Sequence, residues 1–208
     1  SSDVCSSDLE EIPTLTPVGI TRWKGEEWIT QRALDTANFT VEKDALTLCG
    51  NGLDLCDRKM QGLLLVRQQE RAFTAETALE IPAADTAGLT CYYDEHSYLK
   101  FGIGPEGLLL EEYAGYEVVS MQTAPLPAST SHVRLRVTAT DGQRHFAIQD
   151  GTDWHTLWSI PEPRYLTSEG LQCGKRFTGA MVGLYVHGAS AVRFADWSAV
   201  WSCPEEKR

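Results

Sequence analysis

Residues 62–103 form the stretch that decides the fold class, GLLLVRQQERAFTAETALEIPAADTAGLTCYYDEHSYLKFGI. Positions 73, 75, 77, 79 and 81 are mostly apolar, whereas Thr74, Glu76 and Glu80 alternate with them. A period of two is typical of a strand in a sheet with one wet face. The stretch contains four short apolar runs, each ended by polar, Pro or Gly residues that favour turns. We expect these runs to be consecutive antiparallel strands: Leu63–Arg67, Phe73–Ile81, Gly88–Tyr93 and Tyr98–Ile103.

Short apolar runs of the same kind occur along the rest of the chain. No amphipathic pattern of about 12 residues, as a helix would need, separates them. Asp141-Gly142 and Asp150-Gly151 are hairpin-turn dipeptides. This spacing predicts an all-β protein with a two-sheet antiparallel β-sandwich, while a closed barrel or a propeller stays open as an alternative. The further strand candidates are Ala45–Cys49, Leu108–Glu112, Tyr116–Ser120, His132–Thr138, His145–Gln149, Thr156–Ile160, Gly179–His187 and Ala191–Trp197.

The composition sets limits on the class of protein. With 208 residues, of which 42% are hydrophobic and 23% charged, the chain can bury one sizeable core. Its formal net charge of −11 argues against a nucleic-acid partner, because such surfaces gather Lys and Arg. The apolar runs fall short of the ~20 residues that span a bilayer, and the amino end lacks a signal-peptide pattern. We therefore expect a cytoplasmic protein with no membrane partner.

The amino-terminal residues need separate treatment. Residues 1–9, SSDVCSSDL, are rich in Ser and Asp and resemble the in-frame translation of a sequencing-library adapter. We interpret them as an artefact, so that the natural protein continues upstream; the alternative is an ordinary disordered tail. The expected division is an artefact over 1–9, a lead-in or linker over 10–27, a sandwich domain over 28–203 and a tail over 204–208.

The cysteines do not form a recognisable framework. Without Cys5 an odd number remains, with no CxxC pair and no clustered His, so we expect neither a disulfide framework nor a metal site. Cys49 and Cys91 lie within apolar patterns and are interpreted as small buried hydrophobes. Cys49 and Cys56 flank a turn, and a bond between them is the less favoured alternative. We expect no cofactor.

The sequence offers no self-contained catalytic constellation. Neighbouring carboxylates such as Glu111-Glu112 or Glu26-Glu27 point to opposite faces of a strand and cannot flank one bond. Asp94-Glu95-His96 occupies a short hairpin turn, where we expect solvated charge. The Asp141 and Asp150 positions are explained by turn geometry. We therefore expect no catalytic residues in this chain.

Five segments follow one another in the order found in a known accessory module. They are Gly62–Gln69, Phe73–Thr77, Ala87–Leu89, Tyr92–Asp94 and Phe177–Tyr185. Together they resemble the carboxy-terminal concanavalin A-like β-sandwich, a jelly roll, of β-xylosidases of glycoside hydrolase family 43. The similarity runs from about Trp28 to Trp201; the closing segment 192–197 departs from the family's Phe-Asp-Tyr-rich last strand.

The resemblance implies a partner in cis. In that family an amino-terminal five-bladed propeller carries three carboxylates and hydrolyses terminal xylose or arabinose units with inversion. That propeller is not part of this sequence. The implied partners are thus the propeller and a xylo- or arabino-oligosaccharide at the domain interface, with a homo-oligomer as a further option.

The resemblance also points to one loop. Arg176, Phe177 and Thr178 lie in a polar, Gly-bounded stretch before an apolar strand, and the resemblance assigns to them the rim of the sugar pocket. An aromatic ring there would exclude water and limit the depth of the pocket. The alternative is that Phe177 packs under its own loop.

Other aromatic residues allow two interpretations. They could form a stacking platform for sugar rings, or they could fill the core and interfaces of the sandwich, which we favour. Trp23 and Trp28 are expected to pack against the propeller. The freestanding lectin-like sandwich remains the alternative function, and a purely structural interaction domain is the third option. The aromatics considered for the platform are Trp154, Trp158, Tyr165, Trp197 and Trp201.

Overall fold

The computed structural model describes residues 21–31, 36–82, 84–126, 131–140, 142–171, 173–174 and 179–202. Within these ranges the chain consists of strands, turns and two short 3-10 helices, η1 (Thr36–Asn38) and η2 (Arg164–Leu166). The strands are β1 (Thr21–Trp23), β2 (Glu26–Trp28), β3 (Phe39–Val41), β4 (Ala45–Cys49), β5 (Leu63–Arg67), β6 (Ala72–Glu80), β7 (Thr86–Asp94), β8 (Ser97–Gly104), β9 (Gly107–Ala114), β10 (Glu117–Ala124), β11 (His132–Thr140), β12 (Gln143–Asp150), β13 (Asp153–Ile160), β14 (Met181–His187) and β15 (Ala191–Ser202).

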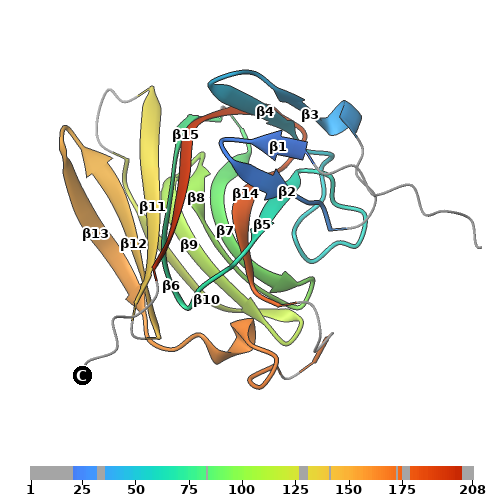
Figure 1. Ribbon diagram of the computed structural model, residues 1–208, viewed down its shortest axis with the longest axis vertical. Coiled ribbons are helices and arrows are strands. Elements are labelled where there is room, and N and C mark those ends of the chain that lie inside the picture. Colours follow the sequence, from blue (N-terminus) through green and yellow to red (C-terminus); the bar gives the residue numbers. More distant parts are fainter. Residues whose placement is uncertain are drawn as a thin grey trace, which may run out of the picture.

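The strands form two large antiparallel sheets and one small hairpin. Sheet I has the order β10-β9-β8-β7-β14-β5, and sheet II has the order β13-β12-β11-β6-β15-β4-β3. β1 and β2 pair with each other, and an isolated bridge between Ile29 and Leu65 joins this hairpin to β5 (Figure 1). The predicted two-sheet antiparallel sandwich is confirmed.

The four runs of the deciding stretch are all strands, but they belong to both sheets. β7 and β8 pair directly, with Leu89 opposite Phe101. β5 and β6 do not pair, because β5 joins β14 in sheet I whereas β6 lies between β11 and β15 in sheet II. The chain therefore crosses between the sheets before and after β6.

Alternating side chains fill the space between the sheets. Along β6 the side chains at 73, 75, 77 and 79 are buried, and the Thr77 hydroxyl donates a hydrogen bond to the backbone oxygen of Ala195 at 3.0 Å. Phe101 of sheet I and Phe146 of sheet II are fully buried, with ring centroids 5.3 Å apart in an edge-on arrangement. Large aromatic residues of this kind dominate the burial of apolar surface in a core.

Trp23 and Trp28 belong to this core, so the expectation that they pack against a separate propeller is wrong. They are 4% and 0% exposed, and the Trp28 ring lies 4.7 Å from that of Trp197. The Trp28 Nε1–H donates to the backbone oxygen of Trp23 at 3.0 Å. Lys24 and Gly25 turn the hairpin with φ of 53° and 83°, so residues 21–27 of the expected lead-in contain β1 and most of β2. β1 and β2 have three residues each and are too short to show an alternating apolar pattern, so the sequence did not predict them.

The described cysteines are free thiols. Cys49, Cys56, Cys91 and Cys173 form no disulfide, and the less favoured pairing of Cys49 with Cys56 is not present. Cys91 is 2% exposed, as expected for a small buried hydrophobe, whereas Cys49 is only partly buried. Burial raises the pKa of the Cys91 thiol, which therefore stays protonated.

Candidate functional site

The predicted rim residues Arg176, Phe177 and Thr178 lie outside the described residues. The two ends of this segment are described. Gly174 has φ of +94° and packs so closely on Asp94 that a Cβ there would lie 2.1 Å from the carboxylate. On the other side, the Gln68 N–H donates to the backbone oxygen of Ala180 at 3.1 Å. Both ends thus lie where β7 ends and β14 begins.

The charges of the neighbouring β7–β8 turn are buried, which corrects the expectation that they are solvated. Asp94 and Glu95 are 3% and 5% exposed. The Asp94 carboxylate accepts a hydrogen bond from the His96 N–H at 2.8 Å, and Glu95 pairs with Arg58 Nε at 3.1 Å. The turn is covered because Gly174 and the segment that carries Arg58 approach it from other parts of the chain.

A second unexpected feature is the outer face of sheet I. Residues 50–62, here named the covering segment, lie over this face and pack Leu55 and Met60 against it. The face itself presents tyrosines: Tyr98 stacks on Tyr113 with centroids 4.6 Å apart and an interplanar angle of 4°. Burial raises the pKa of Tyr98 well above its ordinary value. This second apolar cluster is separate from the core between the sheets.

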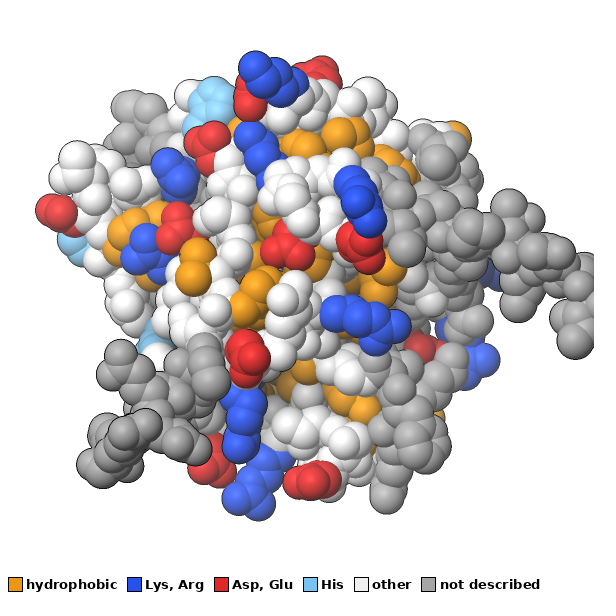
Figure 2. Space-filling model, viewed as in Figure 1, with side chains coloured by type: hydrophobic (Ala, Val, Ile, Leu, Met, Phe, Trp, Pro, Cys, Tyr) orange, Lys and Arg blue, Asp and Glu red, His pale blue; other side chains and the backbone are white. Residues whose placement is uncertain are grey.

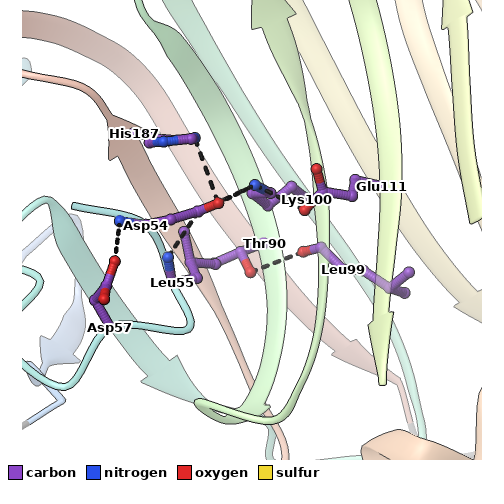
Figure 3. A network of polar contacts seen from close by, with 8 residues as sticks. All are labelled: Asp54, Leu55, Asp57, Thr90, Leu99, Lys100, Glu111 and His187. Carbon is purple, nitrogen blue, oxygen red and sulfur yellow. Dashed lines mark hydrogen bonds and ion pairs between the residues drawn. The ribbon is translucent and has the colours of Figure 1, made fainter. Parts of the chain in front are cut away.

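Lys100 lies at the centre of a charged network on the same face (Figure 3). Its side chain is 3% exposed, and its Nζ lies 3.0 and 2.8 Å from the two carboxylate oxygens of Asp54 and 2.7 Å from Glu111 Oε1. Asp54 also accepts a hydrogen bond from the Leu55 N–H at 2.7 Å and lies 3.5 Å from His187 Nδ1. The network connects the covering segment to β8, β9 and β14.

The geometry of this network is that of a structural clamp. Asp54 and Glu111 both contact one ammonium nitrogen, so the lysine fills the space between the two carboxylates. An inverting glycosidase needs carboxyls about 6.5–9.5 Å apart with a water between them. Glu112 points the other way and accepts a hydrogen bond from the Tyr165 hydroxyl at 2.7 Å, which confirms that adjacent glutamates face opposite sides.

The aromatic residues considered for a stacking platform lie mainly in the core or against it. Trp197 is 3% exposed, and Trp158, Tyr165 and Trp201 are partly buried against the core. Trp154 differs, because the Arg136 guanidinium covers its ring at 3.8 Å. The favoured interpretation as core and interface residues is confirmed for the first four.

Charges of both signs are interspersed over the face of the molecule shown in Figure 2. Among the described residues, no group of three or more His, Cys, Asp or Glu side chains has the arrangement of a metal site. The described part of the chain also contains no helix that is long and apolar enough to cross a membrane.

Two antiparallel sheets packed face to face, with the outer face of one covered by the chain itself, define the class of concanavalin A-like sandwiches. Residues 24–200 match the family described as the beta xylosidase C-terminal concanavalin A-like domain. The match covers most of the chain, so the chain belongs to this family. The sequence matches no curated protein.

Solved structures share the fold at low sequence identity. A Bacteroides ovatus xyloglucan-locus protein, GH43B, aligns with a TM-score of 0.73 and 22% identity over 89% of this chain and 38% of its own. A xylan β-1,4-xylosidase from Bacillus halodurans aligns with a TM-score of 0.72 and 21% identity over 83% of this chain and 36% of its own. The chain thus spans well under half of these enzymes.

One solved structure consists almost entirely of the sandwich fold. A functionally unknown protein from Saccharomyces cerevisiae aligns with a TM-score of 0.58 and 18% identity over 85% of this chain and 96% of its own. In that protein the sandwich accounts for nearly the whole chain.

Sequence reasoning missed the Lys100 network. The signal that could have found it is the position of Lys100 between Tyr98 and Gly102, on one side of an otherwise apolar strand. A lone lysine in such a run normally indicates a wet face. Its carboxylate partners lie 46 and 11 positions away along the chain, so spacing alone could not identify them.

Proposed function

We propose that this chain is the carboxy-terminal accessory sandwich of a family 43 glycosidase that removes terminal xylose or arabinose from hemicellulose oligosaccharides. The observation that carries the proposal is the family match over residues 24–200, combined with coverage of only 36–38% of two family 43 structures. The remaining length of such enzymes supplies the expected propeller with its three carboxylates. The sandwich stabilises this propeller and contributes to the sugar pocket.

Phe177, with Arg176 and Thr178, is the contribution that we propose. Its segment is anchored at one end by the close contact of Gly174 with Asp94 and at the other by the start of β14. Fixed ends reduce the conformational entropy lost when a loop closes over a ligand. The aromatic ring would then exclude water and restrict the pocket to chain ends.

The test uses the full protein with its upstream domain, obtained by resequencing the locus upstream of Glu10. Phe177→Ala is expected to lower kcat/KM for p-nitrophenyl β-xyloside by about tenfold or more, since loss of the ring opens the pocket to water. Tyr116→Ala is the matched control, because Tyr116 is a 63% exposed aromatic outside that segment. Equal kcat/KM for both variants would show that Phe177 is not part of the sugar pocket.

The upstream sequence itself separates the alternatives. A reading frame that continues into a propeller with spaced Asp, Asp and Glu residues supports the glycosidase proposal. A start codon directly upstream of Glu10 would contradict it.

A freestanding carbohydrate-binding sandwich is the second candidate function. It is favoured by the yeast structure, in which the same fold makes up 96% of the chain. This candidate requires that the isolated chain bind xylo-oligosaccharides unaided. A calorimetric titration with xylohexaose that shows no heat of binding would exclude it.

A further inference from the structure

A pocket of about 600 Å³ lies at one end of the sandwich and shares no lining residue with the Lys100 network. Small-molecule sites commonly have volumes of about 300–1,000 Å³. The lining combines polar and apolar residues and comes from segments far apart in the sequence. The side chains that matter here are those of Gln68, Arg71, Arg144, Glu162, Arg164 and Glu169.

Arg144 is a buried cation that has no anionic partner among the residues that the structure describes. It is 9% exposed, on β12, and it points to the same side as the core residue Phe146 two positions along. Its Nη2 donates to the neutral amide oxygen of Gln68 at 3.2 Å, and it forms no ion pair with any residue that the structure describes. Its Nε is buried and lacks a hydrogen-bond partner within the same described ranges.

Such a charge is costly when it is not neutralised. A buried cation without a counterion loses hydration that hydrogen bonds to neutral groups do not fully replace. Arg144 also has a side-chain hydrogen bond with the Cys91 thiol, but burial raises the pKa of this thiol and keeps it protonated, so it supplies no negative charge. An anion in the pocket would supply the missing charge.

The wall of the pocket is preorganised. The Arg164 backbone oxygen accepts hydrogen bonds from the Thr167 N–H at 2.9 Å and from the Thr167 hydroxyl at 2.8 Å. The Gly170 N–H in turn donates to the Thr167 hydroxyl oxygen at 3.1 Å. Glu162 has φ of +38°, a conformation that side chains rarely adopt and that is concentrated at functional sites. A rigid wall lowers the entropy cost of binding.

The lining combines both signs of charge. Arg71 and Arg164 are exposed at the pocket, and Glu162 and Glu169 bring two carboxylates, one of which pairs with Arg164 at 3.3 Å. A simple inorganic anion would meet the carboxylates unfavourably. A sugar acid offers a carboxylate to arginine and hydroxyl donors to the glutamates at the same time. We propose that this pocket binds the carboxylate-bearing unit of an acidic oligosaccharide, a uronic acid.

The proposal depends on the pocket and not on glycosidase activity, so the chain itself is tested. Titration calorimetry with D-glucuronate, D-xylose and inorganic phosphate is performed at low ionic strength, where charge-assisted contacts are strongest. We expect D-glucuronate to bind with a Kd on the order of millimolar, and at least tenfold more tightly than D-xylose or phosphate.

Substitutions then assign the binding to the pocket. Arg71→Gln and Arg164→Gln are exposed changes that should each weaken D-glucuronate binding several-fold. Arg144→Gln should weaken it by about tenfold or more, since charge-assisted hydrogen bonds are the stronger class. Arg193→Gln is the matched control, because its side chain is 44% exposed and pairs with Glu42 outside the pocket. It should leave the Kd unchanged.

Several results would overturn the proposal. They are no binding of D-glucuronate at tens of millimolar, equal affinity for D-xylose, equal affinity for phosphate, or unchanged affinity in both exposed variants. If Arg144→Gln fails to fold, the two exposed variants decide the question. None of these outcomes bears on whether the upstream domain is a propeller.

Discussion

The outer faces of the two sheets differ in what covers them. On sheet II, β6 and β11 alternate between buried and partly exposed side chains, as a sheet with one wet face requires. On sheet I, all of β8 and all of β7 except Thr86 are buried, since the covering segment lies over them. β6 and β11 of sheet II therefore have a single buried side, whereas β7 and β8 of sheet I are buried on both.

Ion pairs on the outer faces of the two sheets differ in how far they are buried. Lys100 on sheet I is 3% exposed between Asp54 and Glu111, whereas Arg136 on sheet II is 28% exposed beside Glu76 at 2.6 Å. Burial removes the water that would otherwise solvate each charge. The buried ion pairs of Lys100 on sheet I therefore hold the covering segment in place, whereas those on sheet II contribute modestly at the surface.

The largest expected effect comes from Lys100→Met. It leaves two carboxylates without their cation, and we expect the free energy of unfolding to fall by about 3–5 kcal/mol. Urea denaturation measures this change in the free energy of unfolding. Arg193→Met, which breaks an exposed pair with Glu42 on sheet II, is the control and should cost no more than about 1 kcal/mol. Equal losses would mean that the two faces do not differ.

Tyr98→Ala should follow with a loss of about 3 kcal/mol, because it removes a fully buried ring that stacks on Tyr92 and Tyr113. The counterpart on sheet II is Trp154→Ala, which removes a partly exposed ring under Arg136. We expect about 1 kcal/mol from the lost cation–π contact. Thermal unfolding of both variants gives the difference, and a larger loss for Trp154→Ala would contradict the comparison.

Glu76→Gln probes the best ion pair of sheet II. Its carboxylate accepts from Arg136 Nε at 2.7 Å and lies 3.8 Å from Arg134. We expect a loss of about 1 kcal/mol that shrinks in 0.5 M salt, since partly exposed pairs are screened. The Lys100→Met loss should change less with salt. The same salt dependence for both would indicate that the Lys100 network is solvated.

The smallest effect concerns the connections between the two sheets. Hydrogen bonding by Ser190 holds the pKa of Asp85 below its ordinary value, and the Ser190 N–H donates to this carboxylate at 2.5 Å. A lowered folded-state pKa stabilises the protein above the unfolded pKa of about 3.9, and this contribution disappears as the pH falls through the folded value. Asp85→Asn should therefore destabilise the protein at pH 7 and cause a smaller loss near pH 3. A loss independent of pH would contradict this origin.

The sequence predicts the strands better than the covering of the sheets. The alternation in Phe73–Ile81 identifies β6, and the Gly residues after Asp141 and Asp150 mark the turns that flank β12. The sandwich class follows from the number and spacing of such runs. These are local signals, because one strand and its turns contain all the information needed.

The features that the sequence did not predict all depend on contacts between residues that are distant in the chain. The run Tyr98–Ile103 gives no sign that the covering segment lies over it, so the burial of Lys100 could not be inferred from the sequence. Trp28 packs on Trp197, which is 169 positions away along the chain, and Trp23 packs on Trp28. Arg144 likewise depends on Gln68, 76 positions away. Tertiary contacts of this length are set by packing, which local periodicity does not encode.

Our central proposal is that this sandwich accompanies a catalytic domain and does not hydrolyse glycosides by itself. The most direct measurement compares p-nitrophenyl β-xyloside hydrolysis by the isolated chain and by the full protein with its upstream domain, under the same conditions. We expect turnover by the full protein and, for the isolated chain, a rate equal to that of buffer. Hydrolysis by the isolated chain that survives repurification would contradict it.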